Sequence, residues 1–233
     1  MEIRADFSKR EVVHSETLEW VASPMPGVDR RALDRVGDEV ARATSIVRYA
    51  PNSEFSPHVH TGGEEFVVLE GVFQDEHGDF PAGSYIRNPP QSSHKPGSDD
   101  GCIIFVKLWQ FQMDDRTHVR LQMNDLSAQP IHVNSDLMQT TLYSDDHEEV
   151  SLLSAAANTE IYIDKPGGIE ILVLEGDMVE QNDTLVKNSW LRLPVGTILN
   201  AQAGEYGVKF WMKTGNLSDV EEQIKRVKLA TKK

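Results

Sequence analysis

Two stretches of this chain repeat each other at a fixed separation, and this repeat constrains the fold more than any other feature. The segment 62–71, Gly-Gly-Glu-Glu-Phe-Val-Val-Leu-Glu-Gly, corresponds to the segment 167–176, Gly-Gly-Ile-Glu-Ile-Leu-Val-Leu-Glu-Gly. The same offset pairs Ser-Tyr-Ile-Arg at 84–87 with Ser-Trp-Leu-Arg at 189–192. A structural unit that occurs twice predicts two similar domains in the chain rather than one large domain.

Both halves consist of short apolar runs separated by turn residues. The run 43–49 is rich in β-branched and aromatic residues, and the run 102–109 has the character of a buried strand. At the offset of the repeat, Phe105 in the second of these runs pairs with Phe210. Steps such as Pro81-Ala82-Gly83 are typical of hairpin connections. The pattern predicts an all-β fold in which each half is a barrel or a sandwich.

The composition along the chain predicts five consecutive segments. These are an N-terminal arm, a first barrel, a linker, a second barrel and a C-terminal helix, at 1–35, 36–112, 113–136, 137–215 and 216–233. The linker is a candidate for a strand exchanged between the halves. The last segment opens with a capping-box pattern and continues with apolar residues at helical spacing. We expect a short amphipathic helix that lies on the second barrel.

A set of metal-binding side chains occurs in the first half. His58 and His60 are two residues apart, so on a strand they point to the same side and can bind one ion. The Thr-Gly-Gly turn that follows brings Glu64 back toward them, and His94, after a Pro-Pro pair, supplies the fourth ligand. Imidazole and carboxylate ligands together suit zinc, iron, manganese or nickel. The expected metal ligands are therefore His58, His60, Glu64 and His94.

The second half serves as an internal comparison for this assignment. At the offset of the repeat, the four ligand positions carry Ile163, Lys165, Ile169 and Leu199. We therefore expect a second barrel without a metal, in which Ile169 and Leu199 fill the space of the ion.

Glu65 is the alternative to Glu64 as the carboxylate ligand. Glu64 is favoured because its counterpart is Ile169 and because it lies seven residues before Gly71. Glu65 instead keeps a glutamate, Glu170, in the second half, as a solvent-facing position would.

Charge and cysteine content exclude several classes of function. The net charge of -14 argues against a nucleic-acid partner, because binding to phosphates needs a basic surface. Cys102 is the single cysteine, which excludes an internal disulfide and a cysteine-rich zinc module, and we expect it to be a small buried strand residue. No apolar run is long enough for a membrane span, and the first residues lack a signal-peptide pattern, so the expected location is the cytoplasm.

The remaining histidines have no partner at ligand spacing. We expect them to be surface residues: His14, His77, His118, His132 and His147.

The motif around His58 resembles that of the cupin superfamily. The first cupin motif continues from His-x-His through a glutamate to a glycine, and His58, His60, Glu64 and Gly71 fit it, although Asn52 replaces the leading glycine. Of the second motif, Pro-x-Gly is present at 81–83, but the histidine comes later, at His94. The closer resemblance is to the ChrR-like cupins, through His-x-His-x-Gly-Gly-Glu-Glu, Val-Leu-Glu-Gly-Val-Phe, Arg-Asn-Pro-Pro, Ser-His-x-Pro and Gly-Cys.

The resemblance implies two tandem cupin domains, the second one degenerate, and one divalent metal per chain. ChrR-like cupins are the C-terminal domains of zinc-binding anti-sigma factors. The first hypothesis is therefore a binding or sensing protein that holds zinc. The separate helical domain that grips the sigma factor uses paired cysteines, which this sequence lacks, so sigma-factor binding is not expected from these residues.

Related cupins include Fe(II)-dependent dioxygenases. The second hypothesis is accordingly an iron or other first-row metal enzyme acting on a small, diketone-like organic molecule in the first barrel. No catalytic residue other than the metal ligands can be named from the sequence. Open edge strands would also permit a homodimer.

Overall fold

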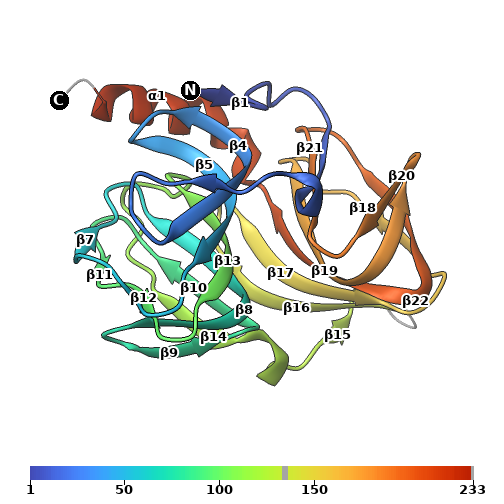
Figure 1. The fold of residues 1–233 in the computed structure, drawn as a ribbon. Coiled ribbons are helices and arrows are strands. Elements are labelled where there is room, and N and C mark those ends of the chain that lie inside the picture. Colours follow the sequence, from blue (N-terminus) through green and yellow to red (C-terminus); the bar gives the residue numbers. More distant parts are fainter. Residues whose placement is uncertain (133–135, 232–233) are drawn as a thin grey trace. The chain divides into compact units, whose positions relative to one another are not determined.

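The computed structural model describes residues 1–132 and 136–231 of the chain. The predicted linker, 113–136, and the predicted helix, 216–233, each include residues that lie outside the described ones, 133–135 and 232–233. The described chain is mainly antiparallel β-structure with one α-helix near its end (Figure 1), which confirms the all-β class. No helix in the described ranges is both long and apolar enough to cross a membrane.

The chain forms two compact units, and neither of them is one continuous segment. The first unit contains Met1–Ala5, Glu19–Asn124 and the C-terminal segment from Glu221, and the second contains Asp6–Leu18 and Asp125–Val220.

The main sheet of the first unit has the strand order β1-β4-β5-β13-β8-β10-β14, all antiparallel. Shorter strands, among them β6, β7, β9, β11 and β12, form the rest of the barrel wall. The strands of this unit are β1 (Glu2–Ile3), β3 (Val21–Ala22), β4 (Val28–Gly37), β5 (Ala41–Tyr49), β6 (Ser53–Glu54), β7 (His58–Val59), β8 (Glu64–Asp75), β9 (Gly78–Pro81), β10 (Ser84–Asn88), β11 (Ser93–His94), β12 (Gly97–Ser98), β13 (Cys102–Leu108) and β14 (Val119–Gln122).

The second unit repeats this plan with the strand order β15-β16-β17-β22-β19-β21-β2. Its strands are β2 (Glu11–His14), β15 (Gln129–Pro130), β16 (Leu137–Ser144), β17 (Glu149–Ala155), β18 (Glu160–Ile163), β19 (Ile169–Glu180), β20 (Asp183–Val186), β21 (Ser189–Leu193) and β22 (Leu199–Thr214). The short 3-10 helices are η1 (Ser15–Thr17), η2 (Met123–Asp125) and η3 (Asn216–Asp219), and the α-helix α1 spans Val220–Ala230.

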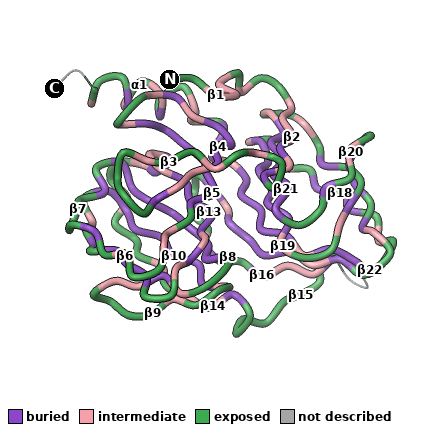
Figure 2. Tube along the Cα trace, viewed as in Figure 1, coloured by how far each residue is buried: buried purple, intermediate pink, exposed green. Residues whose placement is uncertain are grey.

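The central strands of each unit are buried on both faces. Most of β5 and β13, and the first five residues of β8, are buried (Figure 2). This explains why Phe66-Val67-Val68 lacks the apolar-polar alternation of a strand with one wet face. Strand β19 repeats the pattern in the second unit.

The N-terminal segment differs from the expected irregular arm. The range 1–35 contains most of β4, whose residues pair with β5 and form part of the first sheet. The same range contains β2, which pairs with β21 and belongs to the second unit. Strand β2, Glu-Val-Val-His, is too short and lacks the polar-apolar alternation from which a strand could be predicted.

The expectation of an exchanged strand in the linker is wrong. Within the predicted linker, β14 pairs with β10 of its own first unit, and β15 pairs with β16 of the second. Instead, β2 is the strand that comes from the N-terminal part of the chain and pairs within the second unit. It occupies the position on β21 that β14 occupies on β10, since Ser189 pairs with His14 as Ser84 pairs with Gln122.

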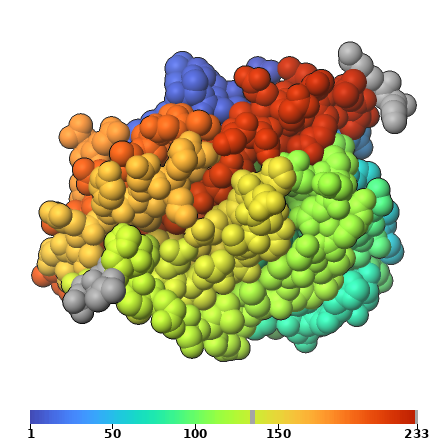
Figure 3. Space-filling model, turned by 180° about the vertical axis from the view of Figure 1, so that it is seen from behind, coloured from blue at the N-terminus to red at the C-terminus, as the bar shows by residue number. Residues whose placement is uncertain are grey.

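We expected the C-terminal helix to lie on the second barrel. This expectation is wrong, because helix α1 packs on the first unit. The Arg42 guanidinium donates from Nε to Oε1 of Gln223 at 2.8 Å, and Arg226 donates to the carbonyl of Phe111 at 3.0 Å. Val227, which is 1% exposed, packs close to Gly37. Figure 3 shows the helix, in red, along the light green segment that contains Phe111. Helical spacing identified the buried face but could not identify its partner.

The register of the last strand corrects one detail of the repeat. Val68 pairs with Ile104, whereas its counterpart Val173 pairs with Phe210. Phe210 therefore corresponds to Ile104, and the counterpart of Phe105 is Trp211. A one-residue insertion before this part of β22 shifts the offset, which a comparison without gaps does not reveal.

The apolar interior of the second unit carries a prediction about stability. Ile169 is fully buried in a cluster that also contains Leu199 and Phe210. We expect Ile169→Ala to lower the free energy of unfolding by about 2 to 5 kcal/mol, because it leaves a cavity among close-packed side chains. Urea denaturation measures this change. Loss of bound metal from the folded variant would contradict the assignment of this unit as the metal-free one.

Candidate metal centre

The structure brings the four predicted ligands together in the first unit. His58 and His94 are direct cross-strand partners in the two-stranded pairing of β7 with β11. His60 follows β7, and Glu64 is the first residue of β8. One candidate ligand atom from each of the four side chains lies within 4.8 Å of the others. The three imidazole centroids are 4.5 to 5.0 Å apart.

The Thr-Gly-Gly turn places Glu64 beside the histidines. Gly63 has a φ of +80°, a conformation that other residues adopt only with strain. A Cβ atom at Gly62 would collide with the Trp109 ring, and one at Gly63 would collide with the Phe111 ring. The two glycines thus let the backbone turn beneath two aromatic side chains, which holds the start of β8 in place.

The hydrogen bonds of His60 leave its Nε2 atom available to an ion. Nδ1 of His60 lies 3.0 Å from Oγ of Ser92, and that hydroxyl donates its own proton to the carbonyl of Pro89 at 2.6 Å. Ser92 must therefore accept from His60, so Nδ1 carries the ring proton. Nε2 then presents a lone pair, as a metal ligand requires.

The other two histidines adopt the same tautomer for related reasons. Nδ1 of His94 faces the Asp75 carboxylate at 3.3 Å, and Nδ1 of His58 faces the carbonyl of Ser56 at 3.4 Å. Both of these partners accept hydrogen bonds, so both Nδ1 atoms donate. A carboxylate behind a ligating histidine fixes the ring and increases its basicity.

Two buried polar atoms at the centre of the cluster fit a bound cation. Nε2 of His60 and Oε2 of Glu64 are buried, and neither makes a hydrogen bond of acceptable geometry in the described part of the chain, although they lie 3.2 Å apart. Nε2 of His94 lies 3.5 Å from the same carboxylate oxygen. Unpaired buried acceptors are costly, and a divalent ion would satisfy all of them. The residues thus fit a first-row transition metal.

The electrostatics keep the carboxylate charged. Burial alone would favour the neutral acid, but the neighbouring His60, His94 and His58 outweigh this effect and lower the pKa of Glu64 to about 2. Burial also opposes a charged His94, yet its hydrogen bond to Asp75 and the charge of Glu64 raise its pKa. Burial lowers the pKa of His58. Glu64 therefore supplies a negative charge to an ion at neutral pH.

A cavity of about 480 Å³ adjoins the cluster within the first unit. Three of the four candidate ligands, His58, His60 and Glu64, line it, so the cluster faces open space on one side. Its walls include Val28, Val47, Phe55, Ile104, Val106 and Leu108. This is the size and character of a site for a small molecule.

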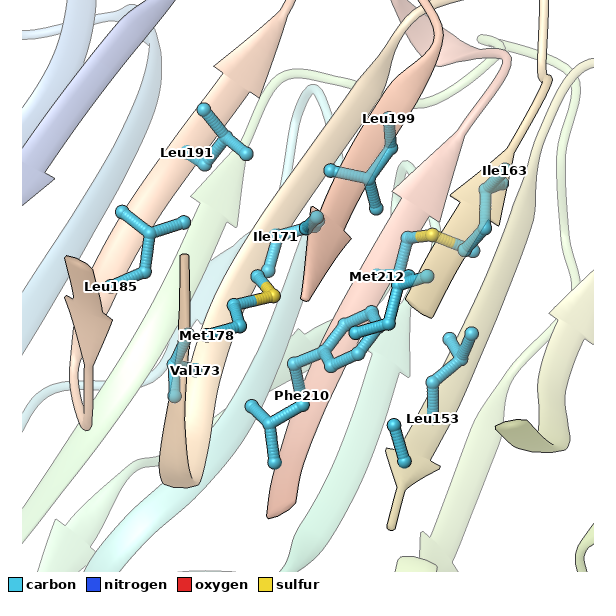
Figure 4. Close-up of a cluster of buried hydrophobic side chains, with 14 of the residues drawn as sticks. Leu153, Ile163, Ile171, Val173, Met178, Leu185, Leu191, Leu199, Phe210 and Met212 are labelled. Atoms are coloured by element: carbon cyan, nitrogen blue, oxygen red, sulfur yellow. The ribbon is translucent and has the colours of Figure 1, made fainter. Parts of the chain in front are cut away.

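The second unit has the same geometry without the polar atoms. Ile163 pairs with Leu199 across β18 and β22, as His58 pairs with His94. Both point into the apolar cluster (Figure 4), and Ile169 is buried in the same cluster. The expectation that Ile169 and Leu199 fill this interior is confirmed. Lys165, at the position of His60, instead forms an ion pair with Glu149 at 3.2 Å.

The description of Glu65 as solvent-facing is wrong. Glu65 is 1% exposed and accepts a hydrogen bond from the Tyr85 hydroxyl, and its cross-strand neighbours are Arg87 and Lys107. Because side chains alternate along β8, Glu65 points away from the barrel interior that Glu64 faces.

The second unit preserves the same arrangement around Glu170. This residue is fully buried between Arg192 and Lys213 on the adjacent strands and accepts a hydrogen bond from Asn216 at 2.7 Å. In both units the glutamate lies between an arginine and a lysine on the adjacent strands, so its repetition did not indicate a solvent-exposed position.

The other polar candidates behave mostly as expected. His77, His118, His132 and His147 are exposed, whereas His14 is half-buried, with Nδ1 3.0 Å from Oγ of Ser189. Cys102 is buried, and burial raises the pKa of its thiol to about 11, so it is not a reactive thiolate.

Comparison with known proteins relates part of the chain to one family. Residues 8–112 match the family of the ChrR cupin-like domain. Over this range the chain is similar to ChrR cupin-like domains. Solved structures of cupin fold also resemble it, among them a cupin 2 conserved barrel domain protein from Leptotrichia buccalis, which is 12% identical with a TM-score of 0.59 over 88% of this chain and 96% of that one. No protein of curated function matches the sequence.

Two further neighbours have descriptions that bear on the site. A putative dioxygenase from Nostoc punctiforme is 18% identical with a TM-score of 0.71, over 91% of this chain and 84% of that one. The bacterial pirin YhhW from Escherichia coli, solved in complex with nickel(II), is 12% identical with a TM-score of 0.64, over 89% of this chain and 99% of that one. At these identities the likeness shows the fold alone.

The residues behind the cluster, Asp75 and Ser92, were not predicted from the sequence.

We expect Asp75→Ala to weaken Zn(II) affinity about tenfold to a hundredfold, because His94 loses the partner that orients its ring. Competition with a chelator measures the affinity. Asp79→Ala removes a carboxylate from the adjacent hairpin, where it accepts a hydrogen bond from Gln74, and serves as the control. Equal affinities of Asp75→Ala and the unaltered protein would contradict the role of Asp75.

Proposed function

We propose that this protein is a metal-dependent oxygenase that binds Fe(II) through His58, His60, Glu64 and His94. Its substrate is a small organic molecule held in the cavity of the first unit. The observation that carries the proposal is the opening of three of the four ligands onto a cavity of about 480 Å³. A purely structural ion needs no such space beside it.

The coordination number explains the preference for iron. Structural zinc is almost always four-coordinate and tetrahedral, so four protein ligands would close its shell. Iron(II) accepts five or six ligands, so four protein donors leave positions on the side of the cavity. When bound, iron would supply the binding and reduction of dioxygen that a protein side chain cannot provide.

The residues of the chain contribute positions and charge. Ser92, Asp75 and the carbonyl of Ser56 each hold one imidazole so that its Nε2 atom points to the common centre. Glu64 offsets one positive charge of a divalent ion. The apolar walls exclude water from the substrate.

The alternative is a binding or sensing protein that holds zinc. The match to the ChrR cupin-like domain supports it, and three imidazoles with one carboxylate also suit zinc. In this case the cavity would admit a small effector ligand and no reaction would follow.

Oxygen consumption separates the two functions. We expect protein loaded anaerobically with Fe(II) to consume dioxygen when a small dicarbonyl compound, either pentane-2,4-dione or acetoacetate, is added, and His94→Ala to lose this activity with its metal. An oxygen electrode measures the rate. The matched control is Leu199→Ala, which alters the corresponding strand position of the second unit and leaves the metal centre intact.

Two results together would contradict the oxygenase function and favour the zinc-binding protein. The first is tightly bound zinc in protein purified without added metal, and the second is no oxygen uptake by the Fe(II) form with any diketone or keto acid.

A further inference from the structure

The interior wall of the first barrel carries an arginine in an otherwise apolar row. Arg30 on β4 pairs with Val47 on β5, and Val47 pairs with Ile104 on β13. Ile104 pairs in turn with Val68 on β8. Direct cross-strand partners share one face of a sheet, so Arg30 projects on the interior face with these apolar residues. It also lines the cavity beside the metal cluster.

A parallel row connects a second arginine to the metal cluster. Glu64 pairs with Leu108, which pairs with Ala43, and Ala43 pairs with Arg35. Arg35 and Glu64 therefore lie on the same face, three strand spacings or roughly 14 Å apart along the sheet. Arg35 lines the cavity too, and its guanidinium donates to the carbonyls of Gly37 and Asp38.

The two arginines differ in their bonding. Arg30 is half-buried, and its guanidinium has neither a hydrogen-bond acceptor nor a carboxylate within the described ranges, 1–132 and 136–231. Arg48, on the other face of β5, pairs with Asp29 at 2.6 Å. A half-buried guanidinium without an acceptor is unfavourable, since arginines in such places pair with carboxylates or phosphates. The guanidinium of Arg30 therefore has donors beside the cavity that no acceptor of the described residues takes up.

A tyrosine beside this arginine also lines the cavity. Tyr49 lines the same cavity and pairs with Val28, two residues before Arg30, so it is a diagonal neighbour of Arg30 on the interior face. Its hydroxyl makes no hydrogen bond with the part of the chain that the structure describes. Burial and the charge of Glu64 raise the pKa of Tyr49, so its hydroxyl stays protonated and can donate.

The charges of the cavity are thus separated. Acidic and metal-binding groups lie at one side, around Glu64, and cationic and donor groups lie at the other, around Arg30, Arg35 and Tyr49. The remaining acidic residue of the lining, Glu39, is exposed to solvent. A ligand that matches this pattern has an anionic group for the arginine side and a group for the metal at its other end.

We propose that the cavity takes a small carboxylate, a keto acid rather than a neutral diketone, with its carboxylate bound by Arg30 and by the Tyr49 hydroxyl. The carboxylate replaces the acceptor that Arg30 lacks within the chain. This inference rests on the proposed function for the role of the metal but concerns the recognition of the substrate.

Two probes of nearly the same shape test the proposal. Acetoacetate and pentane-2,4-dione differ in one terminal group, a carboxylate against an acetyl group. Isothermal titration of protein loaded with Fe(II) in the absence of dioxygen measures the affinity for each probe without any oxygenation, and the iron keeps positions open for the probe. We expect acetoacetate to bind about tenfold to a hundredfold more tightly, since a hydrogen-bonded charge pair distinguishes the two.

Variants of the arginine assign this preference to one side chain. We expect Arg30→Gln to lower the affinity for acetoacetate about tenfold or more and to change the affinity for pentane-2,4-dione by no more than about twofold. Arg30→Lys is expected to keep part of the preference for acetoacetate. Arg48→Gln removes one positive charge outside the cavity and is the matched control. Unchanged iron content and melting temperature show that each variant is folded.

The proposal would be overturned if the wild-type protein bound both probes with equal affinity. It would also be overturned if Arg30→Gln lowered the affinities for both probes by the same factor. A lack of binding by either probe at millimolar concentration would overturn it as well. The outcome is independent of turnover: a protein that prefers acetoacetate but consumes no oxygen with Fe(II) would refute the oxygenase and retain the carboxylate site.

Discussion

The pairing of two very short strands, β7 and β11, sets the chemistry of this protein. It places His58 directly opposite His94, and the glycine turn under Trp109 and Phe111 then returns the chain so that Glu64 completes the set. Neither short strand would be stable alone, so the large sheet and its apolar interior must hold them. The metal centre is therefore a consequence of the barrel, and the geometry of its ligands depends on packing that lies several residues away.

The second unit shows what the same backbone does without the polar side chains. Ile163 and Leu199 pair as His58 and His94 do, and the interior closes around them as an apolar core. The barrel thus does not need a metal to form. Burying three polar side chains of the first unit, His60, Glu64 and His94, beside a cavity costs free energy, and the second unit avoids this cost. The function that we propose, binding of an ion and of a small molecule, accounts for this difference.

The sequence predicted the fold class, the repeat and the four clustered residues because each depends on local spacing or on similarity within the chain. It did not predict what depends on contacts between distant segments. The location of α1 on the first unit, the pairing of β2 with β21 and the carboxylate of Asp75 behind His94 are all of this kind. Glu65 was misread for a related reason: a charged residue in a strand looks exposed until its cross-strand cations are known.

Cobalt(II) substitution tests the central claim most directly, which is that the four residues hold one ion that is open to the cavity. The electronic absorption spectrum of cobalt reports its coordination number. The account predicts one cobalt per chain and the weak visible absorption of a five- or six-coordinate ion, with a change when a small ligand such as azide is added. An intense tetrahedral spectrum that azide does not alter, or no stoichiometric binding of cobalt, would contradict it.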